Sequence, residues 1–197
     1  MKLAWAVAAL VLSVAGVARA GGGAAPPAEP ALDFIGEFSN EVYDNVEGDP
    51  HVSGYTLVLY RQGERVFGTF YAAGGLAGDT PAGRIEAARL LPSSHQLSFS
   101  AKLTTGSVSV PGAPSLQMRP ARDWFEFKGR LSSGKVTGKL VHKDGYDLQN
   151  SARWKTENVT LKKRKPGYAE SEWPTTGELP TNYENWLIQP LRNGPKW

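Results

Sequence analysis

Residues 125–140 read FEFKGRLSSGKVTGKL, and this stretch predicts a β-hairpin. Apolar and polar residues alternate on both sides of a short turn-forming segment, SSG, which is the pattern of two strands that each bury one face. A turn at this segment aligns the two strands on a shared inner face. The predicted pairs are Leu131 with Val136, Gly129 with Gly138 and Phe127 with Leu140.

A second predicted hairpin covers residues 54–70, GYTLVLYRQGERVFGTF, with its turn at Gln62-Gly63. The predicted pairs are Arg61 with Glu64, Leu59 with Val66, Leu57 with Gly68 and Tyr55 with Phe70. The opposite face is also rich in apolar and aromatic residues, which predicts cover on both sides. These residues are Val58, Tyr60, Phe67 and Tyr71. Both hairpins carry a glycine inside the second strand, as curved sheets and small barrels require.

Further alternating segments occur at 34–43, 82–90, 95–103 and 152–161, and a poorly defined one at 107–118. They bring the number of strands to eight or nine. We therefore predict an all-β fold, an antiparallel up-and-down barrel of about eight strands. Residues 21–60 carry seven acids and no Lys or Arg, whereas 119–165 carry thirteen bases against five acids. The first and last strands are thus expected to meet with opposite charges; the same asymmetry could instead steer a partner.

The chain ends differ from its middle. Lys2, the apolar run 3–17 and the small residues Ala18 and Ala20 predict a cleavable signal peptide over residues 1–20, with a retained anchor as the alternative. Export would place the protein in the periplasm or outside the cell. We expect a flexible spacer at 21–32, the barrel at 33–165 and a Pro/Trp-rich tail at 166–197. No later stretch is apolar enough to predict a transmembrane segment.

Composition excludes several kinds of site. The chain has no cysteine, so disulfides, thiol catalysis and cysteine-bound metals are excluded. Removal of the signal peptide takes away Lys2 and Arg19, two of the three excess positive charges, so a nucleic-acid partner is not expected. No nucleophile-elbow or phosphate-loop motif occurs, which favours a protein without catalytic residues or cofactors.

Metal binding finds little support in the sequence. The three histidines, His51, His95 and His142, lack the close spacing of a metal site, although His142 continues an inward pattern and lies near Asp144. The acids Asp44, Glu47 and Asp49 lack the spacing of an EF-hand, so a solvated loop is favoured over a calcium site. We predict no metal site.

The predicted inward faces share aromatic and aliphatic residues, which form the candidate ligand-binding interior. They are Tyr55, Leu57, Phe70, Phe99, Phe125, Phe127 and Leu140. Such an interior either packs solid or encloses a small apolar ligand. Glycines at 68, 129 and 138 fit both alternatives, since they remove interior volume and also permit curvature.

The tail carries three tryptophans, Trp173, Trp186 and Trp197, which are candidates for contact with an envelope protein. Thr181 and Glu184 have capping-box spacing and predict a short helix over 182–189 that packs on the barrel. The basic run at 162–165 ends the last predicted strand and fits either a charged sheet edge or contact with an anionic membrane.

Two segments resemble the calycin group, which includes lipocalin-like and avidin-like barrels. Phe34-Ile-Gly36-Glu-Phe38 is similar to the Gly-x-Trp of their first strand, with Phe38 in place of tryptophan. GERVFGTFYAAGG at 63–75 is similar to the second hairpin of avidin-type barrels. The resemblance implies a barrel that binds a small apolar or amphiphilic ligand. An envelope interaction or structural module with a solid core, and an enzyme, are the alternative functions.

Overall fold

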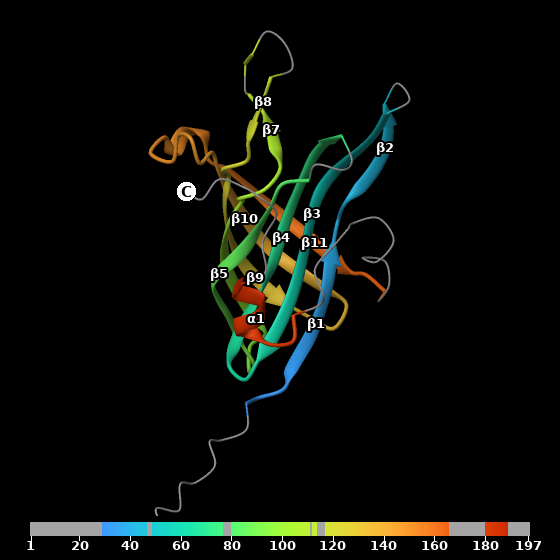
Figure 1. The fold of residues 1–197 in the computed structure, drawn as a ribbon, viewed down its shortest axis with the longest axis vertical. Coiled ribbons are helices and arrows are strands. Elements are labelled where there is room, and N and C mark those ends of the chain that lie inside the picture. The colour runs from blue at the N-terminus through green and yellow to red at the C-terminus, as the bar shows by residue number, and fades with distance from the viewer. Residues whose placement is uncertain are drawn as a thin grey trace, which may run out of the picture.

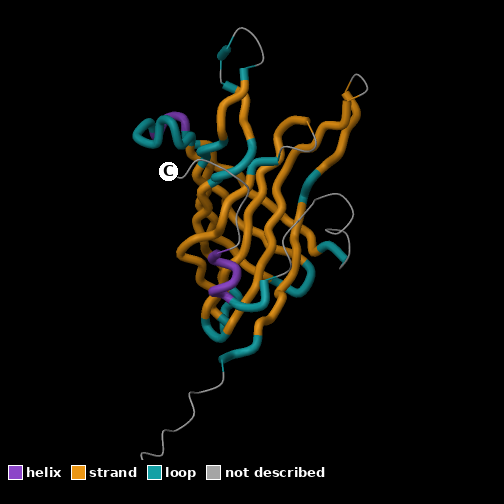
Figure 2. The backbone as a smooth tube through the Cα atoms, in the orientation of Figure 1, coloured by secondary structure: helices purple, strands orange, loops and turns teal. Residues whose placement is uncertain are grey.

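The computed structural model describes residues 29–46, 49–76, 80–110, 112–113, 117–165 and 180–188, arranged as Figures 1 and 2 show. In chain order the elements are β1 (Leu32–Ser39), β2 (Val42–Val46), β3 (Asp49–Gln62), β4 (Arg65–Leu76), β5 (Ala82–Leu91), β6 (Gln96–Lys102), β7 (Ser107–Ser109), β8 (Met118–Pro120), β9 (Trp124–Leu131), β10 (Lys135–Lys143), a 3₁₀ turn (Ser151–Arg153), β11 (Lys155–Lys163) and α1 (Tyr183–Ile188). Within these ranges no helix has both the length and the apolar character needed to cross a membrane.

Eight strands close into an antiparallel barrel. Their order is β1-β3-β4-β5-β6-β9-β10-β11, and β11 pairs back with β1. β2 lies outside the ring and pairs with β3, and β7 and β8 form a separate hairpin at the upper end in Figure 1. The predicted all-β class and barrel of about eight strands are confirmed. At the level of the fold, the barrel is consistent with the calycin resemblance.

The two ends of the barrel differ. One end, called the turn end here, carries the short connections at 63–64, 92–95 and 132–134. The other, the loop end, carries the β7–β8 hairpin and the longer β10–β11 connection at 144–154. The strands enclose the middle of the barrel, so solvent reaches the interior only at these two ends.

The β9–β10 hairpin has the predicted register. Leu131 lies opposite Val136, Gly129 opposite Gly138, and Phe127 opposite Leu140. The buried residues all lie on the inward face, and the fully exposed ones all lie on the outward face. The buried residues are Phe125, Phe127, Val136 and Leu140, and the exposed ones are Lys128, Arg130, Lys135 and Lys139.

The register of the β3–β4 hairpin differs from the predicted one, because each β3 residue pairs with a β4 residue two positions later than predicted. Arg61 faces Val66, Leu59 faces Gly68, Leu57 faces Phe70 and Tyr55 faces Ala72. The loop is residues 63–64, and not 62–63, because Gly63 has φ +59° and occupies the first loop position, where a type II′ turn requires glycine. A shift of two residues preserves the period of a strand, so the predicted inward face is retained.

The barrel closes at a seam between β1 and β11. The register holds two pairs, Phe38 with Lys163 and Ser39 with Lys162. Beyond β11, Arg164 contacts Glu37 at 3.2 Å and Glu41 at 2.9 Å, and Lys163 Nζ donates to the Ile35 carbonyl at 2.8 Å. Burial raises the pKa of the Glu37 carboxyl, and the charge and hydrogen bond of Arg164 oppose that rise. Opposite charges therefore meet at the seam, as the charge pattern predicts.

α1 covers the outer face of the β3–β4 hairpin (Figure 1). Trp186 is 6% exposed and its ring lies 5.1 Å from that of Phe67, with Tyr60 in the same buried cluster. Arg84 donates to the Trp186 carbonyl at 3.3 Å. The hairpin is thus covered on both sides, as its two apolar faces predict.

The cap of α1 differs from the predicted one. Asn182 Oδ1 accepts the N–H of Asn185 at 2.7 Å, so Asn182 caps the helix and Thr181 does not. Glu184 points to Arg65 instead, at 3.2 Å. The cap therefore lies one residue later than the capping-box spacing predicts.

Residues 29–32, predicted as the end of the spacer, belong to the folded part. β1 begins at Leu32, and Gln62 Nε2 donates to the Pro30 carbonyl at 3.0 Å and to Glu29 at 2.9 Å. The predicted signal peptide and most of the tail, including Trp173 and Trp197, lie outside the described residues.

Candidate functional site

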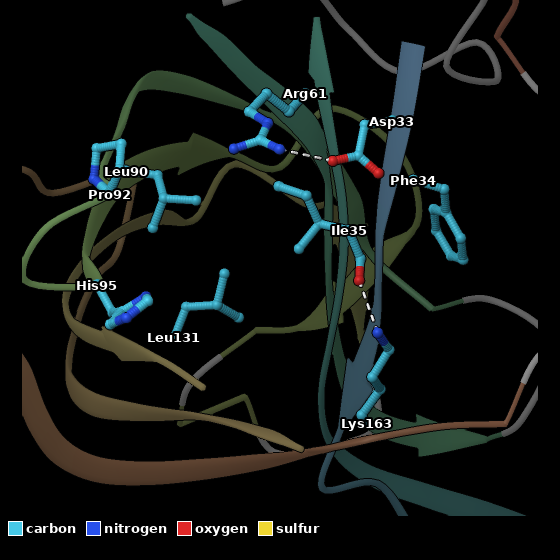
Figure 3. A pocket seen from close by; sticks show the side chains of 9 residues that line it. All are labelled: Asp33, Phe34, Ile35, Arg61, Leu90, Pro92, His95, Leu131 and Lys163. Atoms are coloured by element: carbon cyan, nitrogen blue, oxygen red, sulfur yellow. Dashed lines mark hydrogen bonds and ion pairs between the residues drawn. The ribbon is translucent and has the colours of Figure 1, made fainter. Parts of the chain in front are cut away.

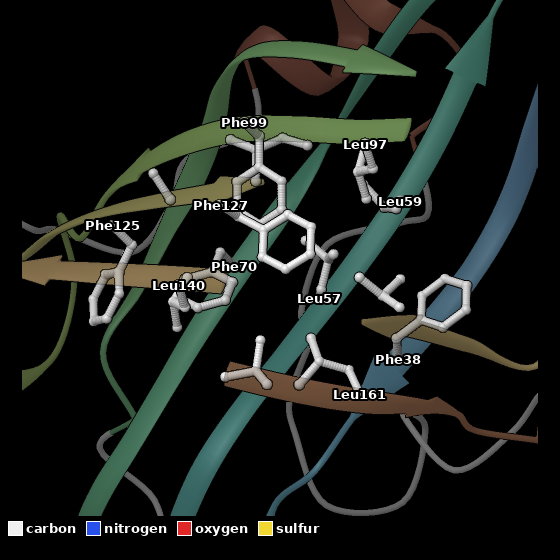
Figure 4. Close-up of a cluster of buried hydrophobic side chains, with 14 of the residues drawn as sticks. Phe38, Leu57, Leu59, Phe70, Leu97, Phe99, Phe125, Phe127, Leu140 and Leu161 are labelled. Carbon is white, nitrogen blue, oxygen red and sulfur yellow. The ribbon is translucent and has the colours of Figure 1, made fainter. Parts of the chain in front are cut away.

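The predicted interior residues lie together inside the barrel. Figure 4 labels six of them, Leu57, Phe70, Phe99, Phe125, Phe127 and Leu140, and Tyr55 is partly buried and packs against this cluster. A chain of rings crosses the interior: Tyr55 stacks on Phe70 at 5.6 Å between centroids, Phe70 lies 5.1 Å from Phe125 and 5.8 Å from Phe99, and Phe99 stacks on Phe127 at 5.1 Å. These rings fill the middle of the barrel. A ligand among them stays a prediction.

The glycines that fitted either a cavity or close packing lie where space is already occupied. A Cβ at Gly129 would lie 2.6 Å from Phe127 Cζ, and one at Gly138 would lie 2.7 Å from the same atom. A Cβ at Gly68 would overlap the carbonyl oxygen of Val58. These glycines therefore allow a ring and a neighbouring strand to approach closely.

A hollow of about 460 Å³ opens at the turn end (Figure 3). Its lining residues are Asp33, Phe34, Ile35, Arg61, Leu90, Pro92, His95, Leu131 and Lys163. Ile35 from β1, Leu90 from β5 and Leu131 from β9 form an apolar floor that packs against the core. The volume lies within the usual range of small-molecule sites.

The rim of the hollow is polar and has more cationic than anionic groups. Arg61 contacts Asp33 at 2.9 Å, and both side chains are about half exposed. Lys163 Nζ reaches the Ile35 carbonyl, and His95 stands in the β5–β6 turn at φ +55°. The rim thus has two cations, Arg61 and Lys163, and one carboxylate, Asp33, so it favours a ligand with a negative group.

The loop end carries a different set of polar groups above the aromatic interior. Tyr55 donates to Glu157 Oε1 at 2.5 Å, and His142 Nε2 lies 2.8 Å from Asp123 Oδ1. The His142 ring stacks on Phe125 with centroids 4.6 Å apart. Burial raises the pKa of the Tyr55 hydroxyl, and its hydrogen bond to Glu157 raises it further. The two carboxylates are thus already paired within the chain.

His142 and Asp144, which the sequence places close together, each make their shortest polar contact with a different residue. Asp144 pairs with Arg119 at 2.8 Å and accepts the N–H of Tyr146. The His142 ring hydrogen-bonds to Asp123, the residue before β9. Burial acts to raise the pKa of the Asp144 carboxyl, but the hydrogen bonds from Arg119 and Tyr146 outweigh it, so the pKa lies below its ordinary value. His142 also acts on Asp144 through its charge, so the two residues are near each other as expected, but the hydrogen bond of His142 is to Asp123.

The acids and histidines that were considered as metal ligands in the sequence, and not predicted to form a site, are not brought together. Asp44 and Asp49 lie on β2 and β3, and Glu47 lies outside the described residues. His51 and His95 are at opposite ends of the barrel. In the described ranges no three His, Asp or Glu side chains converge on a common point that could hold a metal ion. Trp186 is buried within the chain, so it is not exposed to a partner.

Sequence reasoning missed the hollow because its lining comes from strand ends. Three of the lining residues lie at or next to the end of a strand, namely Arg61, Leu131 and Lys163. The turns of the two predicted hairpins directly follow Arg61 and Leu131. In a closed up-and-down barrel, turns at alternate connections gather at one end. That rule, applied to the predicted hairpins, would have placed these residues near one another.

Comparisons with protein-family models, with curated proteins and with solved structures found no match to this chain. Any function is therefore assigned from the geometry of the barrel itself.

Proposed function

We propose that the protein is an exported, non-enzymatic binding protein that holds a small amphiphilic anion in the turn-end hollow. The observation that carries this proposal is the combination of an apolar floor, Ile35, Leu90 and Leu131, with a rim that holds Arg61 and Lys163. An alkyl or aryl group would lie on the floor, and its carboxylate or phosphate would lie near the rim cations.

The filled interior favours this position over the middle of the barrel. A ligand in the middle would have to displace rings such as Phe70 and Phe127, which are 1% and 2% exposed. The hollow needs no such rearrangement, because its floor residues are only partly buried. The calycin resemblance adds support for ligand carriage, with the site at the end of the barrel.

The test is titration calorimetry with fatty acids of increasing chain length, and with the matching alcohols as uncharged controls. We expect the acids to bind more tightly than the alcohols, and affinity to rise with chain length until the floor is covered. Leu90→Glu places a negative charge on the floor and should weaken binding about tenfold or more, since a buried unpaired charge is costly.

Leu91→Glu is the matched control, because Leu91 is the next residue, points outward and is 49% exposed. It should leave affinity within about twofold. Equal losses in both variants, or no binding by the parent chain, would refute the hollow as the site.

A structural or interaction module is the second candidate, and the filled interior favours it. Its exposed apolar side chains include Val42 and Tyr43 on β2, at 63% and 40% exposure, and neither lines the hollow. Substitution of these two by serine should abolish partner capture in an envelope extract and leave fatty-acid titrations unchanged. Export itself is tested by N-terminal sequencing of the secreted or periplasmic chain, with residue 21 expected first.

A further inference from the structure

The outward face of β9, β10 and β11 carries five basic side chains, called the basic wall here. They are Lys128 and Arg130 on β9, Lys135 and Lys139 on β10, and Lys162 on β11, and all five are exposed. These strands lie side by side in the barrel (Figure 1). Because inward and outward residues alternate, the same strands that bury Phe127 and Val136 present this row of cations to solvent.

Two pairs of these lysines lie directly opposite each other. Lys128 faces Lys139 across β9–β10, and Lys135 faces Lys162 across β10–β11. Opposed like charges destabilise a sheet, so folding does not account for them. Among the described residues, none of these four ammonium groups has an ion-pair partner.

Nearby acids do not neutralise the wall. Glu126 is the acid on the outward face of β9, and it is 2.6 Å from Lys143, which belongs to the loop end. Arg130 donates to the Ser94 carbonyl at 3.2 Å and keeps its charge. The acids at the adjoining seam, Glu37 and Glu41, are paired with Arg164. The wall is therefore a concentrated positive field on one side of a nearly neutral molecule.

We propose that the basic wall docks on an anionic lipid bilayer. The cations spread both across three strands and along them, so they match a two-dimensional array of head groups better than a single polymer chain. The outward positions between them carry the short, uncharged side chains of Thr137, Asn158 and Thr160, above which the long lysine stems can reach a flat surface. These positions hold no aromatic ring on which bases could stack, which disfavours a single-stranded nucleic acid.

The strength of docking follows from the number of charges in contact. Each Lys or Arg near an anionic membrane strengthens partitioning about fivefold, and salt screens the attraction beyond a distance of about 8–10 Å. Binding should therefore require anionic lipid and fall steeply with ionic strength. The turn-end hollow takes no part in this contact.

The experiment is co-sedimentation of the chain from residue 21 onward, which contains every described residue, with vesicles of phosphatidylcholine containing about 30% phosphatidylglycerol. Pure phosphatidylcholine vesicles and a second series at about 0.5 M salt are the lipid and salt controls. We expect binding to the anionic vesicles at low salt and loss of binding in both controls.

The decisive variant is Lys139→Glu/Lys162→Glu. Each substitution converts one opposed like-charge pair into an opposite-charge pair, so the barrel should be at least as stable as the parent by urea unfolding. Vesicle partitioning should fall about 25-fold or more, since two of five contacts are reversed. The matched control, Lys155→Glu/Lys165→Glu, changes net charge by the same amount at exposed positions off the wall and should cost less than about threefold.

Three outcomes would overturn the proposal. They are equal losses in the two double variants, binding that persists at high salt, and failure to bind vesicles together with salt-sensitive binding to an acidic polysaccharide. Leu90→Glu separates this proposal from the ligand site, because it should weaken fatty-acid binding and leave vesicle binding unchanged.

Discussion

The β9–β10 hairpin and the β1–β11 seam are both antiparallel strand pairs of one barrel, but different interactions hold them. The hairpin has eight consecutive residue pairs and a short turn, and its inner face is buried. The seam has two residue pairs and a further backbone hydrogen bond, in which the Arg164 N–H donates to the Glu37 carbonyl at 2.8 Å. Side chains add the remaining contacts, which are Arg164 with Glu37 and Glu41, and Lys163 with the Ile35 carbonyl. One is closed mainly by backbone and packing, the other largely by charge.

The difference shows how closure depends on chain distance. Residues 125–140 are adjacent in sequence, so their pairing has a small loop-closure cost. β1 and β11 are neighbours in space, but all the other strands of the barrel lie between them in the sequence. Their pairing becomes favourable only when those strands are in place. Specific ion pairs at this point favour the closed ring over an open, aggregation-prone edge.

The largest expected effect is in the hairpin. Phe127 is 2% exposed and lies over Gly129 and Gly138, so Phe127→Ala leaves a cavity that neither glycine can fill. We expect a loss of about 4 kcal/mol in the free energy of unfolding, measured in urea by tryptophan fluorescence. Thr137→Ala, on the outer face of the same hairpin, should change it by less than about 0.5 kcal/mol. A loss below about 2 kcal/mol for Phe127→Ala would mean that the interior rearranges to fill the space.

The next effect is at the seam. Arg164→Met keeps an unbranched apolar stem but leaves Glu37 and Glu41, 11% and 2% exposed, without their cation. We expect a loss of about 3 kcal/mol, and faster hydrogen exchange in β1 and β11 than in β9 and β10. Addition of Glu37→Gln and Glu41→Gln should recover much of the stability, because the unpaired charges are then gone. If Arg164→Met alone costs less than about 1 kcal/mol, the backbone closes the seam without help from these charges.

The same contrast explains what the sequence could predict. The β9–β10 register follows from the alternation in FEFKGRL and a short turn, both local signals. The predicted β3–β4 register was wrong by two residues, because the sequence around Gly63 does not show that this glycine has a positive φ. His142 is near Asp144, as expected, but the sequence did not predict its hydrogen bond to Asp123. The opposite charges of the seam were predictable from composition, whereas the hollow was not, because its floor is assembled from β1, β5 and β9.

The smallest expected effect compares the pH dependence of two carboxyls, Glu37 at the seam and Asp144 at the loop end. Burial raises the pKa of Glu37 above its ordinary 4.5, so its contribution to stability is complete below pH 4.5 and is lost as pH rises through its folded pKa. The pKa of Asp144 lies below its ordinary 3.8, so its contribution is present above pH 3.8 and is lost as pH falls through its folded pKa.

Urea unfolding of the parent, Glu37→Gln and Asp144→Asn chains at pH 7, 5 and 3 tests both directions. As pH falls from 7 towards 4.5, the parent should gain stability relative to Glu37→Gln, because the folded chain takes up the Glu37 proton first. Below pH 3.8 the parent should lose stability relative to Asp144→Asn, by about 1 kcal/mol or less, since the Arg119 contact is partly exposed. If both differences moved in the same direction with pH, the two carboxyls would share one kind of environment, and the distinction between a buried seam and a hydrogen-bonded loop end would fail.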